Sequence, residues 1–76
     1  EELAEYEELI RRLYEAISSL PPMQARRVHA RYMLGMKVKD IAAMEGITPS
    51  QAGKSIHAAL RGLRRYFARQ KWTVNL

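Results

Sequence analysis

The stretch Gly-Ile-Thr-Pro-Ser-Gln that begins at Gly46 constrains the fold more than any other part of this chain, because it joins a helix stop to a helix start. Glycine readily adopts the left-handed conformation that often ends a helix. Thr48 suits the N-cap of a new helix, Pro49 its first position and Gln51 its third, so that Thr48 and Gln51 form a capping box. We therefore predict that one helix ends at Gly46 and that the next runs from Pro49 to about Arg69.

Apolar residues at alternating spacings of three and four predict an amphipathic N-terminal helix over residues 3–20, with acidic residues in its first turns. We expect its apolar stripe to pack on the other helices; the stripe consists of Leu3, Tyr6, Ile10, Leu13, Ile17 and Leu20. Pro21 and Pro22 end this helix, because a residue that precedes proline is disfavoured in helical conformation.

Two shorter helices are predicted between the long ones. The first covers residues 23–34, and Gly35 ends it. Three of its side chains are expected to face inward: Ala25, Val28 and Tyr32. Three basic ones are expected to lie on its surface: Arg26, Arg27 and Arg31. The second covers residues 38–45 and begins at Lys37, which lacks a capping side chain; its buried residues are expected to be Val38, Ile41 and Ala42.

No alternating strand pattern occurs, so we expect an all-α fold with four helices in one domain over residues 1–76. Residues 38–67 are expected to form a C-terminal helix-turn-helix, in which the small Ala42 and Ala52 permit a close crossing and Ile47 fills the turn. An ordinary helical hairpin is the alternative. Trp72, in the aperiodic segment 70–76, either folds back onto the core or belongs to a disordered end.

The last helix has two unlike faces. At about 100° per residue, one sector is apolar and is expected to face the core: Ala52, Ile56, Ala59, Leu60, Leu63, Tyr66 and Phe67. The opposite sector is polar and basic: Ser50, Lys54, His57, Arg61 and Arg65. Gly53 lies at the border, where it weakens the helix. Either it is a tolerated weak spot, or the missing side chain permits close approach of a DNA backbone or a neighbouring helix.

Charge is divided unevenly along the chain. Residues 1–22 carry six acidic and two basic side chains, a net charge of −4, whereas residues 23–76 carry eleven basic and two acidic ones, a net charge of +9. Such a basic block is typical of nucleic-acid binding, although a solvated basic surface has the same composition. The chain has no cysteine, and its apolar runs are too short for a membrane span. Its first residue, Glu1, leads us to expect a segment of a longer protein.

The order of several short motifs resembles region 4 of bacterial sigma factors of the sigma-70 type. The resemblance covers roughly residues 9–67 and rests on Leu20-Pro21, Arg26-Arg27, Arg31-Tyr32, Gly35, Asp40-Ile41-Ala42, Gly46-Ile47-Thr48 and Ala59 to Leu63-Arg64. It implies a bacterial, phage or mobile-element protein of the cytoplasm. Its implied partners are double-stranded promoter DNA at a −35 element and the flap of the RNA polymerase β subunit.

The resemblance also implies roles for individual residues. Base contacts would fall on Pro49, Ser50, Gln51 and Lys54. Phosphate contacts would fall on Lys37, Thr48, Ser55 and Arg61, to which the basic face adds His57 and Arg65. Many family members carry arginine or glutamate at the positions of Pro49 and Ser50, so this chain departs from the family where bases are read.

Other functional classes remain as alternatives. The acidic N-terminal helix suits a protein-interaction module that docks on RNA polymerase or an anti-sigma protein. The same helix-turn-helix would also serve a phage or plasmid repressor that binds as a symmetric dimer. His29 and His57 are isolated, and no catalytic constellation occurs, so we expect no metal, no cofactor, no membrane partner and no enzymatic activity.

Overall fold

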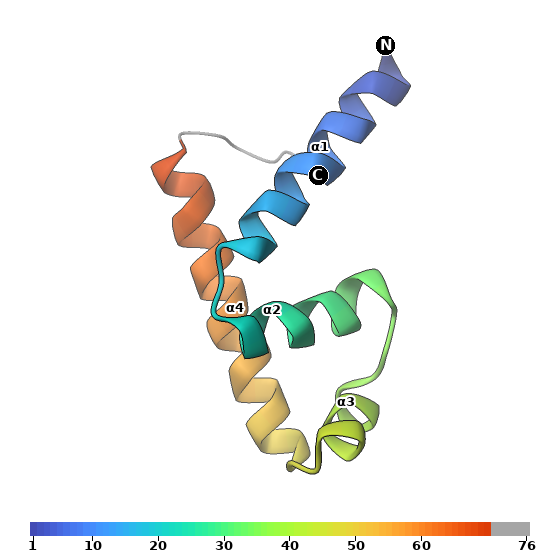
Figure 1. The fold of residues 1–76 in the computed structure, drawn as a ribbon, viewed down its shortest axis with the longest axis vertical. Coiled ribbons are helices and arrows are strands. Elements are labelled where there is room, and N and C mark those ends of the chain that lie inside the picture. The colour runs from blue at the N-terminus through green and yellow to red at the C-terminus, as the bar shows by residue number, and fades with distance from the viewer. Residues whose placement is uncertain (71–76) are drawn as a thin grey trace.

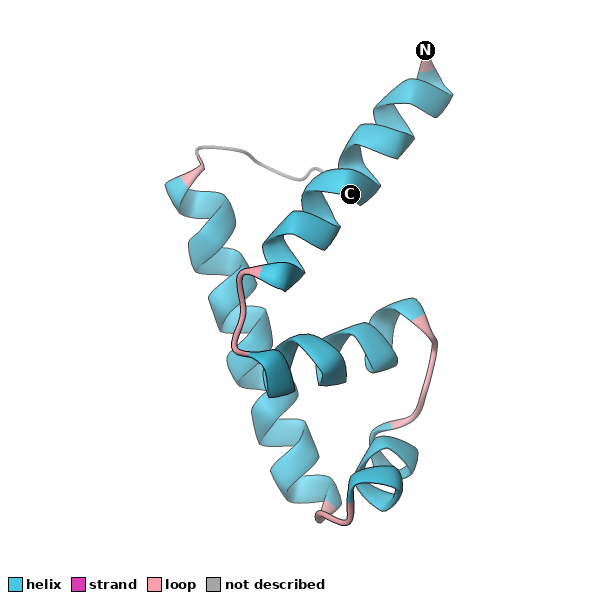
Figure 2. Ribbon diagram, viewed as in Figure 1, coloured by secondary structure: helices cyan, strands magenta, loops and turns pink. Residues whose placement is uncertain are grey.

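The computed structural model describes residues 1–70, which form four α-helices and one π-helical turn. In chain order these are α1 (Glu2–Ser18), α2 (Pro22–Val28), the π-helical turn η1 (His29–Met33), α3 (Val38–Glu45) and α4 (Pro49–Arg69) (Figure 1). Within the described residues every regular element is helical (Figure 2). The predicted all-α fold of four helices is confirmed. Trp72 lies outside the described residues.

The long helix α4 forms the spine of the molecule, and the other helices pack along it (Figure 1). The main core joins α1, the α1–α2 connection, α2 and the second half of α4; its buried residues are Ala16, Ile17, Leu20, Val28, Ala59 and Leu63. A further group of buried residues, nearer the start of α4, joins α3 to it: Ile41, Ala42, Ala52 and Ile56. The apolar sector predicted for the last helix therefore faces the core, although Leu60, Tyr66 and Phe67 are only partly buried.

Only the C-terminal part of α1 packs on the body of the protein. The helix ends at Ser18 rather than at Leu20, and Leu20 is buried from the connection that follows. Leu3 and Tyr6, predicted to pack on other helices, are 70% and 61% exposed. The prediction fails for them because α1 diverges from α4, so that its first turns project beyond the body (Figure 1).

A ladder of ion pairs runs along the exposed side of α1. Arg11 pairs with Glu8 and Glu15, each at 2.6 Å, and Arg12 pairs with Glu8 at 2.8 Å. Hydrogen bonds from Arg11 and, to a smaller extent, from Arg12 hold the pKa of the Glu8 carboxyl below its ordinary value. The hydrogen bond with Glu8 in turn raises the pKa of the Arg11 guanidinium. Pairs at these helical spacings stabilise the projecting helix locally.

The second predicted helix is not regular to its end. After Val28 it widens into η1, where the N–H of Leu34 donates to the carbonyl of His29 at 3.1 Å, five residues back. Tyr32 lies within this wider turn, whose backbone departs from the α-helical spacing on which the prediction rested. Tyr32, predicted to face inward, is 56% exposed. Gly35 follows with a φ of 71°, the left-handed conformation expected there.

Arg27 joins three helices, although it was predicted to lie on the surface. Its guanidinium pairs with Glu45 of α3 at 2.9 Å and donates a hydrogen bond to Ser55 Oγ of α4 at 3.0 Å. The Arg27 and Glu45 side chains are only 13% and 17% exposed. A mostly buried pair of this kind fixes α3 and α4 relative to α2. Burial removes water from both charges, and each charge is stabilised instead by its partner.

Candidate nucleic-acid interface

The connection between α3 and α4 is a tight turn. Gly46 has a φ of 69°, and the N–H of Ile47 donates to the carbonyl of Ala42 at 3.0 Å. The left-handed residue satisfies carbonyls at the end of α3 and redirects the chain within one residue. Ala42 and Ala52 are both buried, as predicted for a close crossing of the two helices.

A capping box forms the start of α4, as predicted. The N–H of Gln51 donates to Thr48 Oγ1 at 3.1 Å, and the N–H of Thr48 donates to Gln51 Oε1 at 2.9 Å. Thr48, Pro49, Ser50 and Gln51 are all exposed. The first turn of α4 therefore reaches solvent in a fixed conformation, at the end of the helix that lies beside α3 (Figure 1).

The polar sector of α4 faces solvent along most of its length. Its exposed members are Ser50, Lys54, His57, Arg61 and Arg65. They recur every three or four residues, so they lie on one side of the helix and span about 22 Å at 1.5 Å per residue. No acidic residue occurs in α4. Within residues 1–70, no carboxylate pairs with Lys54, Arg61 or Arg65, so their charge is available to a polyanion.

Two of the residues to which the resemblance assigns phosphate contacts lie elsewhere. Ser55 is partly buried on the inner side of α4, where its hydroxyl accepts the hydrogen bond from Arg27. Lys37 is the N-cap of α3, has no side-chain capping bond and is exposed. The structure thus gathers the outer residues of α4 on one face but brings neither Ser55 nor Lys37 into it.

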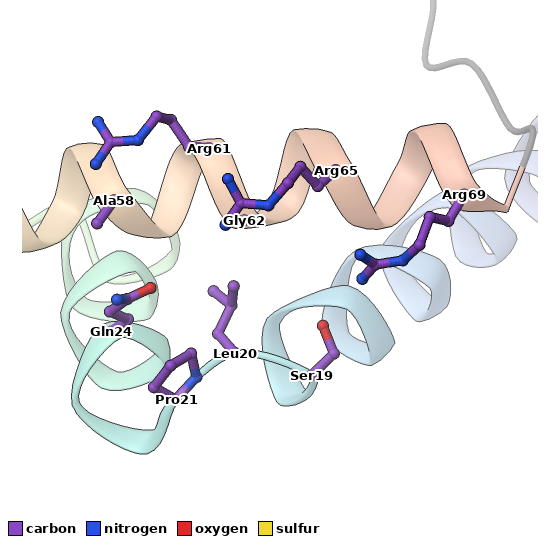
Figure 3. Close-up of a pocket in the computed structure, with 9 residues that line it drawn as sticks. All are labelled: Ser19, Leu20, Pro21, Gln24, Ala58, Arg61, Gly62, Arg65 and Arg69. Carbon is purple, nitrogen blue, oxygen red and sulfur yellow. The ribbon is translucent and has the colours of Figure 1, made fainter.

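A groove next to this face was not anticipated from the sequence. It has a volume of about 350 Å³ and lies between α4 and the α1–α2 connection, with Arg61, Arg65 and Arg69 along its α4 side (Figure 3). Leu20 points from the connection toward Gly62 of α4. A Cβ atom added at Gly62 would lie 2.6 Å from Leu20 Cδ2, whereas one added at Gly53 would meet no atom within 4 Å.

Gly62, rather than Gly53, is therefore the glycine at which another segment approaches α4. The suggestion that Gly53 accommodates a neighbouring helix is wrong, because a Cβ atom added there would meet no atom of another segment within 4 Å. The spacing of the arginines at every fourth residue was the available sequence signal for the basic side of the groove.

An apolar cleft opens on another part of the molecule. It has a volume of about 200 Å³ and is lined by side chains of α1, α2, η1 and α4: Leu13, Ile17, Val28, Tyr32, Met33, Leu60 and Leu63. Every lining side chain except the tyrosine is purely apolar, so the cleft suits an apolar side chain of a protein partner better than a nucleic acid.

The described part of the chain, residues 1–70, contains no cluster of three or more histidine, cysteine, aspartate or glutamate residues that could hold a metal ion. Over the same residues, no helix is both long enough and apolar enough to cross a membrane.

Comparison with protein families finds one match in accord with this geometry. Residues 10–63, most of the chain, match the family described as sigma-70, region 4. No curated protein and no solved structure was found to match the chain. The matched range contains α2, α3, the tight turn and the exposed first turns of α4. The capped helix-turn-helix and the family match together establish that the chain belongs to the sigma-70 region 4 family of helix-turn-helix, DNA-binding domains of transcription regulation.

Proposed function

We propose that this domain binds double-stranded promoter DNA at a −35-type element, in association with RNA polymerase. The observation that carries the proposal is the single exposed, basic face of α4, which begins at a capped and solvent-exposed helix start. A helix-turn-helix places such a helix in the major groove with its N-terminal residues against base edges. Membership of the family supports promoter binding and association with the polymerase in general.

The residues of this face divide between two kinds of contact. Ser50, Gln51 and Lys54 lie in the first two turns, where side chains reach base edges, and Pro49 offers them only an apolar contact. Thr48 sits just before the first turn, where backbone phosphates pass a helix start. His57 and Arg61 lie about 10 and 16 Å farther along than Ser50, which suits them to phosphates at the wall of the groove.

Arg65 continues the phosphate-contacting row, about 22 Å beyond Ser50. Lys37, exposed at the start of α3, would contact a phosphate from that helix rather than from the outer face of α4. We leave Ser55 out of this surface, because its hydroxyl is engaged by Arg27 and partly buried.

The experiment that tests the proposal compares binding of a −35-type duplex and a random duplex by fluorescence anisotropy at two salt concentrations. Charge reversal of Lys54, Arg61 and Arg65 together is expected to abolish binding, and Arg61→Ala alone is expected to weaken binding to both duplexes. Each phosphate contact that is lost should reduce the slope of log K against log salt by about 0.9.

Arg26→Glu is the control for charge reversal, because Arg26 is exposed on α2 and lies on a different helix. A single Arg61→Glu variant matches it in charge change and is expected to bind far more weakly. Equal effects of the two reversals, or unimpaired binding by the triple variant, would show that the face has been placed wrongly.

The apolar cleft supports the second half of the proposal, docking on the flap of the polymerase β subunit. Its lining comes from α1, α2, η1 and the apolar side of α4, so a partner bound there would leave the basic outer face of α4 uncovered. Tyr32→Ser should weaken binding to an isolated β-flap fragment without loss of DNA affinity, because Tyr32 is already largely exposed and its replacement spares the core.

The projecting half of α1 favours a second candidate function, that of a protein-interaction module. Together with the preceding Glu1 it carries five of the eight acidic residues, and it also carries the exposed Leu3 and Tyr6. This surface is suited to a basic partner such as a site on RNA polymerase or an anti-sigma protein. Absence of DNA binding at low salt, with polymerase binding retained, would favour this candidate over the first.

A further inference from the structure

The capping box determines which end of the Gln51 carboxamide faces outward. Gln51 Oε1 accepts a hydrogen bond from the N–H of Thr48 at 2.9 Å, while the N–H of Gln51 donates to Thr48 Oγ1 at 3.1 Å. The carbonyl end of the side chain is thereby turned back to the backbone. Gln51 is exposed, and within residues 1–70 its Nε2 amino group has no hydrogen-bond partner. The side chain thus offers solvent two N–H donors.

The neighbouring side chains of the first two turns reinforce this donor character. Lys54 has three donors and no acceptor, and Pro49 has no polar side-chain atom. Only the hydroxyl of Ser50 both donates and accepts. The absence of acidic residues from α4 leaves no carboxylate to accept a hydrogen bond from a base.

The major-groove edges of the four bases respond differently to a donor. Guanine presents two acceptors, N7 and O6, and thymine presents the acceptor O4. Cytosine presents an amino group. Adenine presents an amino group beside the acceptor N7, and the usual glutamine contact with adenine needs both ends of the carboxamide, the oxygen to accept from N6 and the nitrogen to donate to N7.

We propose that Gln51, held by the capping box, selects guanine or thymine at the base that it faces and disfavours adenine and cytosine. The inference rests on the proposed function, since it names the kind of target that the same face reads. It differs from the general expectation for glutamine, because here the oxygen that would accept from adenine is engaged within the protein. For Gln51 to read adenine, the adenine N6 amino group would have to reach the same oxygen that accepts from the N–H of Thr48, on the end of the carboxamide that is turned back to the backbone.

Gln51→Glu tests this assignment while it preserves the box. Glutamate is the other residue that completes a capping box at this position, so the variant should fold as the wild type does. Its outward atom is a second carboxylate oxygen, which accepts rather than donates. Gln51→Met serves as the matched variant of similar length that has neither a donor nor a strong acceptor.

The three proteins are compared on a set of duplexes that carry each of the four base pairs at each position of the −35-type element. For the wild type we expect one position at which guanine or thymine is favoured about tenfold over adenine and cytosine. Gln51→Met should flatten the preference at that position, and Gln51→Glu should invert it toward cytosine or adenine. Thermal denaturation of Gln51→Glu should match that of the wild type.

Hydrogen exchange of the Thr48 amide supplies a second readout. We expect the amide to stay protected in the DNA complex, because the box persists there. Wild-type preference for adenine at the position that Gln51→Met flattens, or fast exchange of the Thr48 amide in the complex, would overturn the inference alone and leave the proposed function standing. Failure of the wild type to bind any of the duplexes would overturn both.

Discussion

Replacing Gly53 by alanine should stabilise the protein, and the same change at Gly62 should not. Both glycines lie inside α4, so each substitution gains the same helix propensity, about 1 kcal/mol. They differ in what the new methyl group meets. At Gly53 it enters open space, whereas at Gly62 it would come within 2.6 Å of Leu20 Cδ2, an atom of a buried core side chain.

The magnitudes follow from these surroundings. Gly53→Ala should raise the free energy of unfolding by about 1 kcal/mol, which corresponds to about 4–8 °C in Tm for a domain of this size. At Gly62 the methyl group must displace Leu20, and overpacking of a core costs about 1–3 kcal/mol, so the gain is cancelled or reversed. Gly53→Ala should thus be at least about 1 kcal/mol more stable than Gly62→Ala.

Thermal and urea denaturation followed by circular dichroism measure both quantities on variants that differ only in position. A destabilised Gly53→Ala, or equal stabilities for the two variants, would refute the argument from local surroundings. DNA affinity then separates the two roles suggested for Gly53. Weaker binding by the more stable variant would indicate close approach to the DNA backbone, and unchanged binding would leave Gly53 as a tolerated weak spot.

Three other predictions concern the contacts that hold the fold. Arg27→Ala should destabilise the protein by about 2–3 kcal/mol in urea denaturation, because it leaves the Glu45 carboxylate unpaired. Glu45→Ala should cost much less stability in the Arg27→Ala variant than in the wild type, because it then removes a charge that is already unpaired. Thr48→Ala should lose about 1 kcal/mol of stability in thermal denaturation, while Thr48→Ser stays near the wild type. By NMR, the Glu8 carboxyl should titrate below the ordinary glutamate pKa, and its midpoint should rise in Arg11→Ala. Since the folded-state pKa is lowered, the small stabilisation from Glu8 is complete above the ordinary glutamate pKa and disappears as the pH falls through the lowered pKa.

The helix-turn-helix could be predicted from sequence because its signals are local. The bounds of α3 and α4 agree with the predicted 38–45 and 49–69, since Gly46 and the capping box at Thr48 act within a few residues of the ends that they define. Periodicity also identified the buried side of α4, because a helix that packs on a core repeats its apolar residues every three or four positions.

The errors arise where the outcome depends on distant parts of the chain. Periodicity shows which side of α1 is apolar, but not that α1 leaves the body before Leu3 and Tyr6 find a partner. Arg27 was assigned to the surface because its ion pair with Glu45 joins residues that are far apart in sequence. The π-helical turn that contains Tyr32 interrupts the helical periodicity from which its inward position was predicted.

The candidate site, too, could be predicted only where it depends on a single helix. The outer face of α4 follows from helical spacing, and the exposure of Lys54 and Arg61 agrees with it. The groove beside Gly62 and the engagement of Ser55 by Arg27 depend on how α1 and α2 are placed against α4, so neither could be obtained from one helix alone.

The unbroken course of α4 from Pro49 to Arg69 sets a fixed rotational phase between the two proposed partners. Leu60 and Leu63 line the apolar cleft, and Arg61 stands between them in sequence on the outer face. One residue inserted between Lys54 and Leu60 would turn the base-reading turn by about 100° and advance it by about 1.5 Å relative to the cleft. The rotation about the α4 axis between the base-reading turn and the apolar cleft would therefore determine on which side of the duplex a docked polymerase lies.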